Sequence, residues 1–136
     1  YVGGDAHALP FAARAFDTVS AVTSLCFVRD EYRALQEMVR VARRCVLLGL
    51  LHRRSLWHAR KHGRDAYAGA HWHDEDAVRE LVARAAPRAR AVEFSRHLFW
   101  PGGPRLGGCL ERLPALRRRG GFLAVAIFLP TDTKSA

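Results

Sequence analysis

Stretches of apolar residues, separated by polar and charged residues, predict four strands along the chain. Residues 16–22 have the short apolar pattern with β-branched side chains that is typical of a strand. Residues 45–51 are apolar throughout, which favours a strand buried on both faces, as in a parallel sheet. Two further strands are predicted over residues 91–99 and 121–129.

Two helices are predicted between these strands, and an aspartate precedes each of them. Asp30 would cap a helix running to about Arg43, because its carboxylate can accept from the free backbone N–H groups of the first turn. Asp74 would cap a second helix, which Pro87 ends. Both helices carry apolar residues at the i, i+3, i+4, i+7 spacing of one buried face: Leu35, Met38, Val39 and Ala42 on the first, and Val78, Leu81, Val82 and Ala85 on the second.

Alternating strands and helices predict the α/β class, with helices on both faces of one sheet. A basic and aromatic insert occupies residues 52–72 and is expected to be helical up to Gly63. Residues 101–104 are predicted to form a turn and residues 109–119 a short helix. The polar residues 131–136 are expected to be frayed.

The composition is that of an ordinary globular domain, because the 136 residues are 49% hydrophobic and 26% charged. The formal net charge is +9, and nearly all of the basic residues are arginines. The arginines are scattered and accompany no recognised nucleic-acid motif, so nucleic acid is not expected as a partner. No apolar run approaches the roughly 20 residues that cross a bilayer, so no membrane span is expected.

Three cysteines, Cys26, Cys45 and Cys109, are widely spaced and form no C-x-x-C pair. This set argues against a disulfide framework and suits a reducing compartment. The first residues also lack the basic-then-apolar layout of a signal peptide. We therefore expect a cytoplasmic protein whose cysteines are small core residues.

The first candidate for chemistry is Asp5, which would follow the end of a strand that starts at or before Tyr1. In an open α/β sheet, ligands bind at the carboxyl ends of the strands. A carboxylate there can accept a hydrogen bond from an exocyclic amine, such as that of adenine. Thr23 and Ser24 emerge at the carboxyl end of the next strand, so two consecutive strand ends are expected to face one crevice.

The stretch GDAHALPFAARAFDTVSAV, residues 4–22, resembles the mid-domain signature of class I S-adenosylmethionine-dependent methyltransferases of the ubiquinone-biosynthesis-like group. Their pattern is roughly G-D-A-x-x-L-P-F followed by F-D-x-V. The segments EMVRVARR and CVLLGLLHRRSLW resemble the helix and strand that follow it in that family. The resemblance implies a Rossmann-like methyltransferase sheet and transfer of a methyl group from S-adenosylmethionine to a small-molecule acceptor.

The resemblance also implies roles for individual residues. Asp5 would bind the adenine amine, Ala6 would contact the adenine through its backbone, and Leu9 would wall the ring. Thr23 and Ser24 would line the methionine end of the cofactor. The resemblance assigns no catalytic residue, and it leaves open whether oxygen, nitrogen or carbon of the acceptor is methylated.

Two family features have no counterpart in this sequence: the Gly-rich turn E/D-x-G-x-G and the acid that holds the ribose hydroxyls. The first helix also ends ARRCV rather than in a Pro-Gly step, so the turn after it must differ. We therefore expect residues 1–130 to be the C-terminal two-thirds of a methyltransferase domain, without its first two strand–helix units. Their absence would expose an apolar sheet edge, so we expect weak or no cofactor binding by this chain and a tendency to associate.

Metal binding and hydrolysis are two alternatives that the residues argue against. His71-x-His73-Asp74 suggests metal ligands, but Asp74 is better used as a helix cap and no second ligand pair stands at a suitable spacing. We therefore expect no metal. A hydrolase lacks support because there is no G-x-S-x-G elbow. Tyr67 or His73 could act as a general base for methyl transfer.

The insert at residues 52–72 has two readings. Its arginine stems can pack on its aromatic rings as a cover over the sheet. Alternatively, the insert forms a substrate lid, whose basic residues would suit an anionic acceptor such as a carboxylate or phosphate ester. The alternative to an enzyme is a non-catalytic methyltransferase-like module that uses a basic face to bind an acidic partner.

Overall fold

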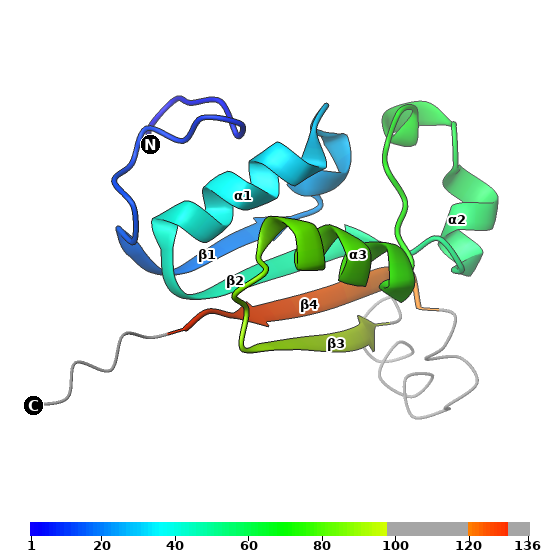
Figure 1. Cartoon of the computed structure of the whole chain (residues 1–136). Coiled ribbons are helices and arrows are strands. Elements are labelled where there is room, and N and C mark those ends of the chain that lie inside the picture. The colour runs from blue at the N-terminus through cyan, green and yellow to red at the C-terminus, as the bar shows by residue number, and fades with distance from the viewer. Residues whose placement is uncertain (98–119, 131–136) are drawn as a thin grey trace, which may run out of the picture.

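A mixed four-stranded sheet forms the centre of the molecule (Figure 1). The computed structural model describes residues 1–97 and 120–130. The strands are β1 (Phe16–Val22), β2 (Ala42–Leu51), β3 (Ala91–His97) and β4 (Phe122–Phe128), in the spatial order β1-β2-β4-β3. Strands β1 and β2 are parallel, and β4 runs antiparallel to both of its neighbours. The predicted α/β class and all four predicted strands are therefore confirmed.

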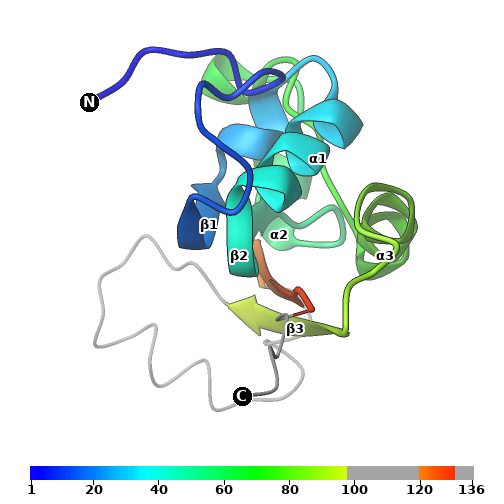
Figure 2. The same cartoon turned by 60° about the vertical axis from the view of Figure 1, so that its left-hand side comes forward.

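Two long helices, α1 (Glu31–Val41) and α3 (Glu75–Ala85), lie on the same side of the sheet (Figure 2). The carboxylate of Asp30 accepts from the backbone N–H of Arg33, and that of Asp74 accepts from Ala77, which confirms both predicted N-caps. The short elements are η1 (Ser24–Phe27), α2 (Leu56–Lys61) and η2 (Asp65–Tyr67).

The core lies between these two helices and the sheet. The helices contribute buried side chains at the predicted spacing, among them Leu35, Met38, Val78 and Val82. They pack against alternate residues of the two central strands, among them Val46, Leu48, Val125 and Ile127. Each such side chain stabilises the fold by about 1.5–3 kcal/mol when fully buried, so this layer holds the sheet and helices together.

The junction between α1 and β2 differs from the expectation. The helix ends at Val41 rather than Arg43, and β2 begins at once, because Ala42 already has extended backbone angles of φ −80° and ψ 142°. Arg43 and Arg44 therefore open a strand instead of closing a helix. The missing Pro-Gly step is replaced by a direct passage from helix to strand.

The face of the sheet opposite α1 and α3 carries no helix within the described residues. Strand β2 was expected to be buried on both faces, but Leu47 is 42% exposed on this side. Val22 and Phe128 are also exposed, and an open groove of about 570 Å³ runs across this face over β1, β2 and β4. The apolar run of β2 therefore has a cover on one side of the sheet only.

Two further expectations have different outcomes. Residues 1–4 form no strand, and Asp5 makes only an isolated bridge with Ala8, because no described strand lies beside this segment to pair with it. The predicted turn at 101–104, the short helix at 109–119 and the tail at 131–136 lie outside the described residues.

Candidate functional site

The loop that carries Asp5 is fastened to α1 by a Glu37–Arg40 ion pair. Glu37 Oε2 accepts from the backbone N–H of Leu9 at 2.8 Å, while Arg40 donates to the carbonyls of Leu9 and Phe11 at 3.0 and 2.9 Å. Arg40 also donates to Glu37 at 2.7 Å, and this hydrogen bond is the main reason that the pKa of Glu37 lies below its ordinary value. The N-terminal segment consequently runs along α1 in Figure 1.

Asp5 lines an open groove of about 640 Å³ beside the N-terminus of α1. The groove lies between two segments: Asp5, His7 and Ala8 on one side, and Phe27, Val28, Arg29, Asp30 and Arg33 on the other. The second segment follows the carboxyl end of β1 through η1. The groove thus lies beside the segment that follows the carboxyl end of β1, and strand ends of this kind are where ligands of α/β proteins commonly bind.

His7 holds the carboxylate of Asp5 in a defined position. Asp5 Oδ1 accepts from the backbone N–H of His7 at 2.9 Å and lies 2.7 Å from the ring nitrogen Nδ1. The backbone hydrogen bond first, and the ring hydrogen bond second, hold the pKa of Asp5 below its ordinary value. The groove therefore presents an ionised carboxylate.

The other sequence-predicted site residues lie near the groove but are not among its lining residues. Ala6 is half-buried against the core, and the backbone of Leu9 is held by the Glu37–Arg40 pair. Thr23 has a left-handed φ of 59° and donates its N–H to Gly49, and Ser24 begins η1. The roles given to Ala6, Leu9, Thr23 and Ser24 therefore stay predictions.

Asp5 is the one predicted site residue among those that line the groove, and three of the others bear on its chemistry: His7, Phe27 and Asp30. His7 occupies a variable position of the family-like motif, so the motif gave no signal for it. Phe27 is 48% exposed, which is unusual for a phenylalanine and could be found only from the structure. Asp30 was recognised as a helix cap, and the structure adds that its backbone N–H lies 3.2 Å from His7 Nε2.

A second cluster of titratable groups lies on the other side of the α1 N-terminus. His73 Nε2 is 2.9 Å from one oxygen of Glu31, and His71 Nδ1 is 3.2 Å from the other. Burial acts to lower the pKa of His73, but its interactions with the nearby Cys26 and with the Glu31 carboxylate raise it to about 9. His73 is therefore protonated at neutral pH, which argues against its expected role as a general base.

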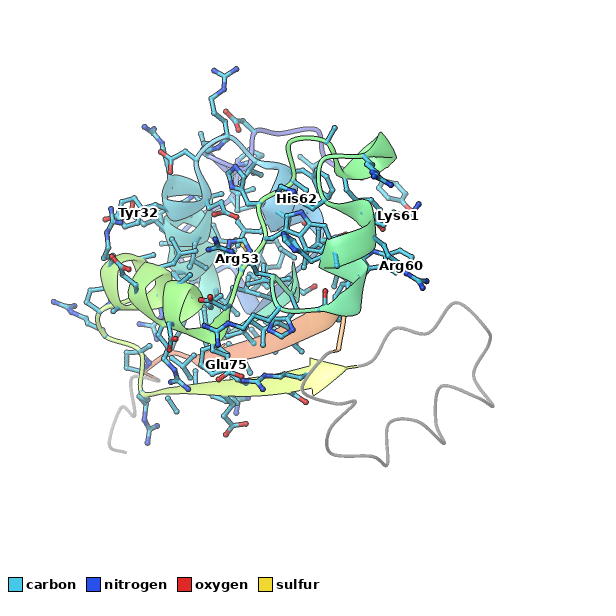
Figure 3. All side chains as sticks on the ribbon, turned by 90° about the vertical axis from the view of Figure 1, so that its right-hand side faces the viewer. Tyr32, Arg53, Arg60, Lys61, His62 and Glu75 are labelled. Carbon is cyan, nitrogen blue, oxygen red and sulfur yellow. The ribbon has the colours of Figure 1, made fainter. Side chains whose placement is uncertain are left out.

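The insert at residues 52–72 forms an aromatic cluster, and basic residues lie around this cluster. The rings of Trp57 and Tyr67 meet edge to face at 6.2 Å, and Tyr67 lies 5.9 Å from Trp72. Figure 3 shows Arg60 and Lys61 on the outer side of α2, pointing away from the body of the molecule. Aromatic packing and an outward basic side are compatible with both readings of the insert, so the structure leaves its role open.

Two features are absent from the described residues. Among residues 1–97 and 120–130, no group of three or more His, Cys, Asp and Glu side chains is arranged to hold a metal ion. In the same part of the chain, no helix has the length and apolar character needed to cross a bilayer.

The chain is similar to several methyltransferases. Residues 1–48 match the family model described as a methyltransferase domain. A SAM-dependent (S-adenosylmethionine-dependent) methyltransferase of Thermotoga maritima superposes with a TM-score of 0.70 at 21% identity, over 93% of this chain and 62% of its own. A SAM-dependent methyltransferase of Archaeoglobus fulgidus gives a TM-score of 0.62 at 12% identity, over 93% and 66%. No curated protein sequence matches the chain.

A third structure is the complex of a Haloferax volcanii methyltransferase with the methyltransferase activator Trm112. It gives a TM-score of 0.66 at 16% identity, over 97% of this chain and 61% of the matched chain. This chain thus spans about three fifths of the length of these structures. The resemblance to class I methyltransferases is confirmed, by sequence over residues 1–48 and by fold for the sheet and its helices.

Proposed function

We propose that the chain is part of an S-adenosylmethionine-dependent methyltransferase domain that methylates a small-molecule acceptor. The observation that carries the proposal is the position of Asp5. Asp5, in the loop that resembles the family motif, lines a groove beside η1, which follows the carboxyl end of β1, and this position supports the proposal. The match of residues 1–48 to the methyltransferase domain supports the same assignment.

The residues of the groove fit the nucleoside part of this cofactor. Asp5 can accept from the exocyclic amine of adenine, and the exposed ring of Phe27 offers an apolar face against which a base can pack. Ala6 and Leu9 would complete the adenine site, and Thr23 and Ser24 would line the methionine end. The cofactor supplies an electrophilic methyl group on a charged sulfur, so the chain has to bind and orient rather than activate it.

The open sheet face and the free edge of β1 support the proposal that the domain contains further elements. Within the described residues β1 pairs only with β2, and the apolar residues Leu47 and Val22 are exposed on the uncovered face. A further strand beside β1 and helices over this face would bury that surface. Without them we expect weak cofactor binding and association of chains through the edge.

We further propose that the insert at residues 52–72 is a lid over the acceptor. Its basic residues Arg53, Arg60 and Lys61 would suit an anionic acceptor, such as a carboxylate or a phosphate ester. A cytoplasmic location is part of the same proposal, because Cys26 and Cys45 are free thiols and one of them is fully buried.

The test is a titration with S-adenosylmethionine by isothermal calorimetry, on this chain and on the polypeptide translated with its in-frame upstream coding sequence. We expect weak binding by residues 1–136 and tighter binding by the longer polypeptide. Asp5→Ala should weaken both, whereas Asp17→Ala, an exposed aspartate outside the groove, should change neither. Tight stoichiometric binding by residues 1–136 would contradict the partial domain, and no binding by the longer polypeptide would contradict the enzyme.

A second candidate function is a non-catalytic module for an acidic partner. Arg44, Arg88 and Arg90 are exposed and make no ion pair within the described residues. Two of them flank the end of β4, because Leu129 N–H donates to the Arg44 carbonyl and Arg90 N–H to the Phe128 carbonyl. This basic edge lies at the opposite end of the sheet from the groove.

The two candidates make different predictions for binding of poly-glutamate at physiological salt. A module of this kind would bind it, and Arg88→Gln with Arg90→Gln would abolish the interaction. Arg79→Gln serves as the matched control. It also removes a positive charge, but Arg79 lies on α3, where it pairs with Glu75 and stacks over the ring of Phe94. Absence of binding by the wild type removes this second candidate.

A further inference from the structure

The carboxylate of Asp5 uses only one of its two oxygens within the protein. Oδ1 receives both contacts from His7, the backbone N–H at 2.9 Å and the ring nitrogen Nδ1 at 2.7 Å. No hydrogen bond to Oδ2 exists within the described residues. One oxygen of an ionised carboxylate therefore remains as an acceptor for a ligand in the groove.

The contacts of His7 determine where its ring proton lies. The backbone N–H of Asp30 is directed at His7 Nε2, 3.2 Å away. An N–H group can donate only to a nitrogen that carries no proton, so Nε2 is bare and the proton is on Nδ1. Nδ1–H then donates to Asp5 Oδ1. His7 is thereby assigned as a neutral imidazole that links the Asp5 loop to the first residue before α1.

The backbone carbonyl of His7 provides a second contact between the Asp5 loop and the start of α1. Arg33 Nε donates to the carbonyl of His7 at 3.1 Å, and the Arg33 backbone N–H donates to the Asp30 carboxylate at 3.0 Å. The charged groups that face His7 are therefore Asp5 on its own loop and Asp30 and Arg33 at the start of α1, with Arg29 lining the same groove. His7 is held on both sides, so its ring has one orientation.

We propose that His7 is a positioning residue for base recognition: its neutral Nδ1–H form aims Asp5 so that the free oxygen receives the exocyclic amine of a bound nucleoside. This inference rests on the proposed function, because it presumes that the groove takes the nucleoside part of the cofactor. The exocyclic amine of adenosine can donate to the free oxygen of Asp5. Inosine has a carbonyl oxygen in place of the amine, so two acceptors would face each other there. The site should therefore prefer adenosine to inosine.

The test uses the ¹⁵N-labelled chain and nuclear magnetic resonance, a method suited to the weak binding expected of this chain. Long-range ¹H–¹⁵N spectra report the His7 tautomer without any ligand, and amide shifts report titrations with adenosine and inosine. His7→Leu removes the donor to Asp5 and should lower adenosine affinity about tenfold. His7→Asn keeps an N–H donor near the place of Nδ1, so it should bind adenosine within about threefold of wild type.

The outcomes separate this inference from the proposed function. Adenosine binding that is equal for wild type and His7→Leu, or equal to inosine binding, would overturn the role of His7 and leave the methyltransferase proposal standing. A proton found on Nε2 at neutral pH would overturn it as well. If the wild type has the Nδ1–H form but binds neither nucleoside, the nucleoside site itself fails. Should His7→Leu not fold, the tautomer of the wild type and the adenosine affinity of His7→Asn still decide.

Discussion

Two histidine–carboxylate pairs flank the N-terminus of α1, and they differ mainly in burial. His7 Nδ1 lies 2.7 Å from Asp5 Oδ1, with side chains 24% and 66% exposed. His73 Nε2 lies 2.9 Å from Glu31 Oε1, with side chains 7% and 17% exposed. The same two types of group at nearly the same distance thus occupy a solvent-facing groove on one side of the helix and the protein interior on the other.

The difference lies in what each histidine does with its second nitrogen and its charge. His7 accepts a backbone N–H on Nε2, so it is neutral and leaves an oxygen of Asp5 for a ligand. His73 faces Cys26 and Glu31 in the interior, and its pKa is raised to about 9, so it is a cation locked onto an anion. Burial therefore turns one pair into a structural connection, while exposure leaves the other available for recognition.

The buried pair also ties the insert to the sheet. The backbone N–H of His73 donates to the Leu51 carbonyl at 2.9 Å, and His71 N–H donates to the Cys26 carbonyl at 2.7 Å. Glu31, the first residue of α1, receives both imidazole rings. The segment with His71 and His73 is thus bound to the end of β2 and to η1 through its backbone, and to the start of α1 through the Glu31 carboxylate.

The largest effect is expected from Glu31→Gln. This change leaves the His73 imidazole buried without its anion, and breaking a buried ion pair from one side costs about 3–5 kcal/mol. Urea unfolding measures the loss. Glu75→Gln on α3 is the matched control, because its ion pair with Arg96 at 2.7 Å is partly exposed and should contribute no more than about 1 kcal/mol. Equal losses for the two variants would show that burial does not separate the pairs.

The next effect is a pH dependence of stability that comes from His73. Its folded-state pKa of about 9 lies above the ordinary value of 6.5, so the stabilisation is complete below pH 6.5 and is lost as the pH rises through 9. Because one pKa unit corresponds to about 1.4 kcal/mol, the pair contributes about 3 kcal/mol at its maximum. Urea unfolding at intervals from pH 6.5 to pH 9 should show this decline in wild type and not in His73→Gln.

The sequence predicted the architecture well because the architecture depends on local patterns. Both helix caps and all four strands follow from spacing and residue type, whereas the site role that the motif gives to Asp5 stays a prediction. The contacts that hold the two histidines could not be predicted, since His73 meets Glu31 across 42 residues of chain and His7, although only two residues from Asp5, receives the Asp30 N–H across 23. The open face was missed for the same reason. The apolar run of β2 indicates that both of its faces need a cover, but it does not indicate which segments of the chain provide one.

A smaller effect is expected from the helix cap that lies between the two pairs. Asp30→Ala removes the acceptor of the Arg33 N–H, and loss of such a cap costs about 1 kcal/mol. Asp74→Ala removes the equivalent cap of α3 and should cost a similar amount in urea unfolding. A much larger loss for Asp30→Ala alone would show that the His7 link to this residue contributes to global stability.

The smallest effect on stability is expected from His7→Leu, which should leave the unfolding midpoint unchanged because its pair with Asp5 is exposed. The change should instead be local. The Asp30 amide loses its acceptor and should exchange with solvent faster, whereas the Leu9 amide, held by Glu37 Oε2 at 2.8 Å, provides an internal control that stays protected. Amide hydrogen exchange at the two positions measures this directly. Two results would contradict the contrast between the pairs: a loss of stability for His7→Leu as large as that for Glu31→Gln, or faster exchange of both amides together. Either result would mean that His7 stabilises the fold as His73 does.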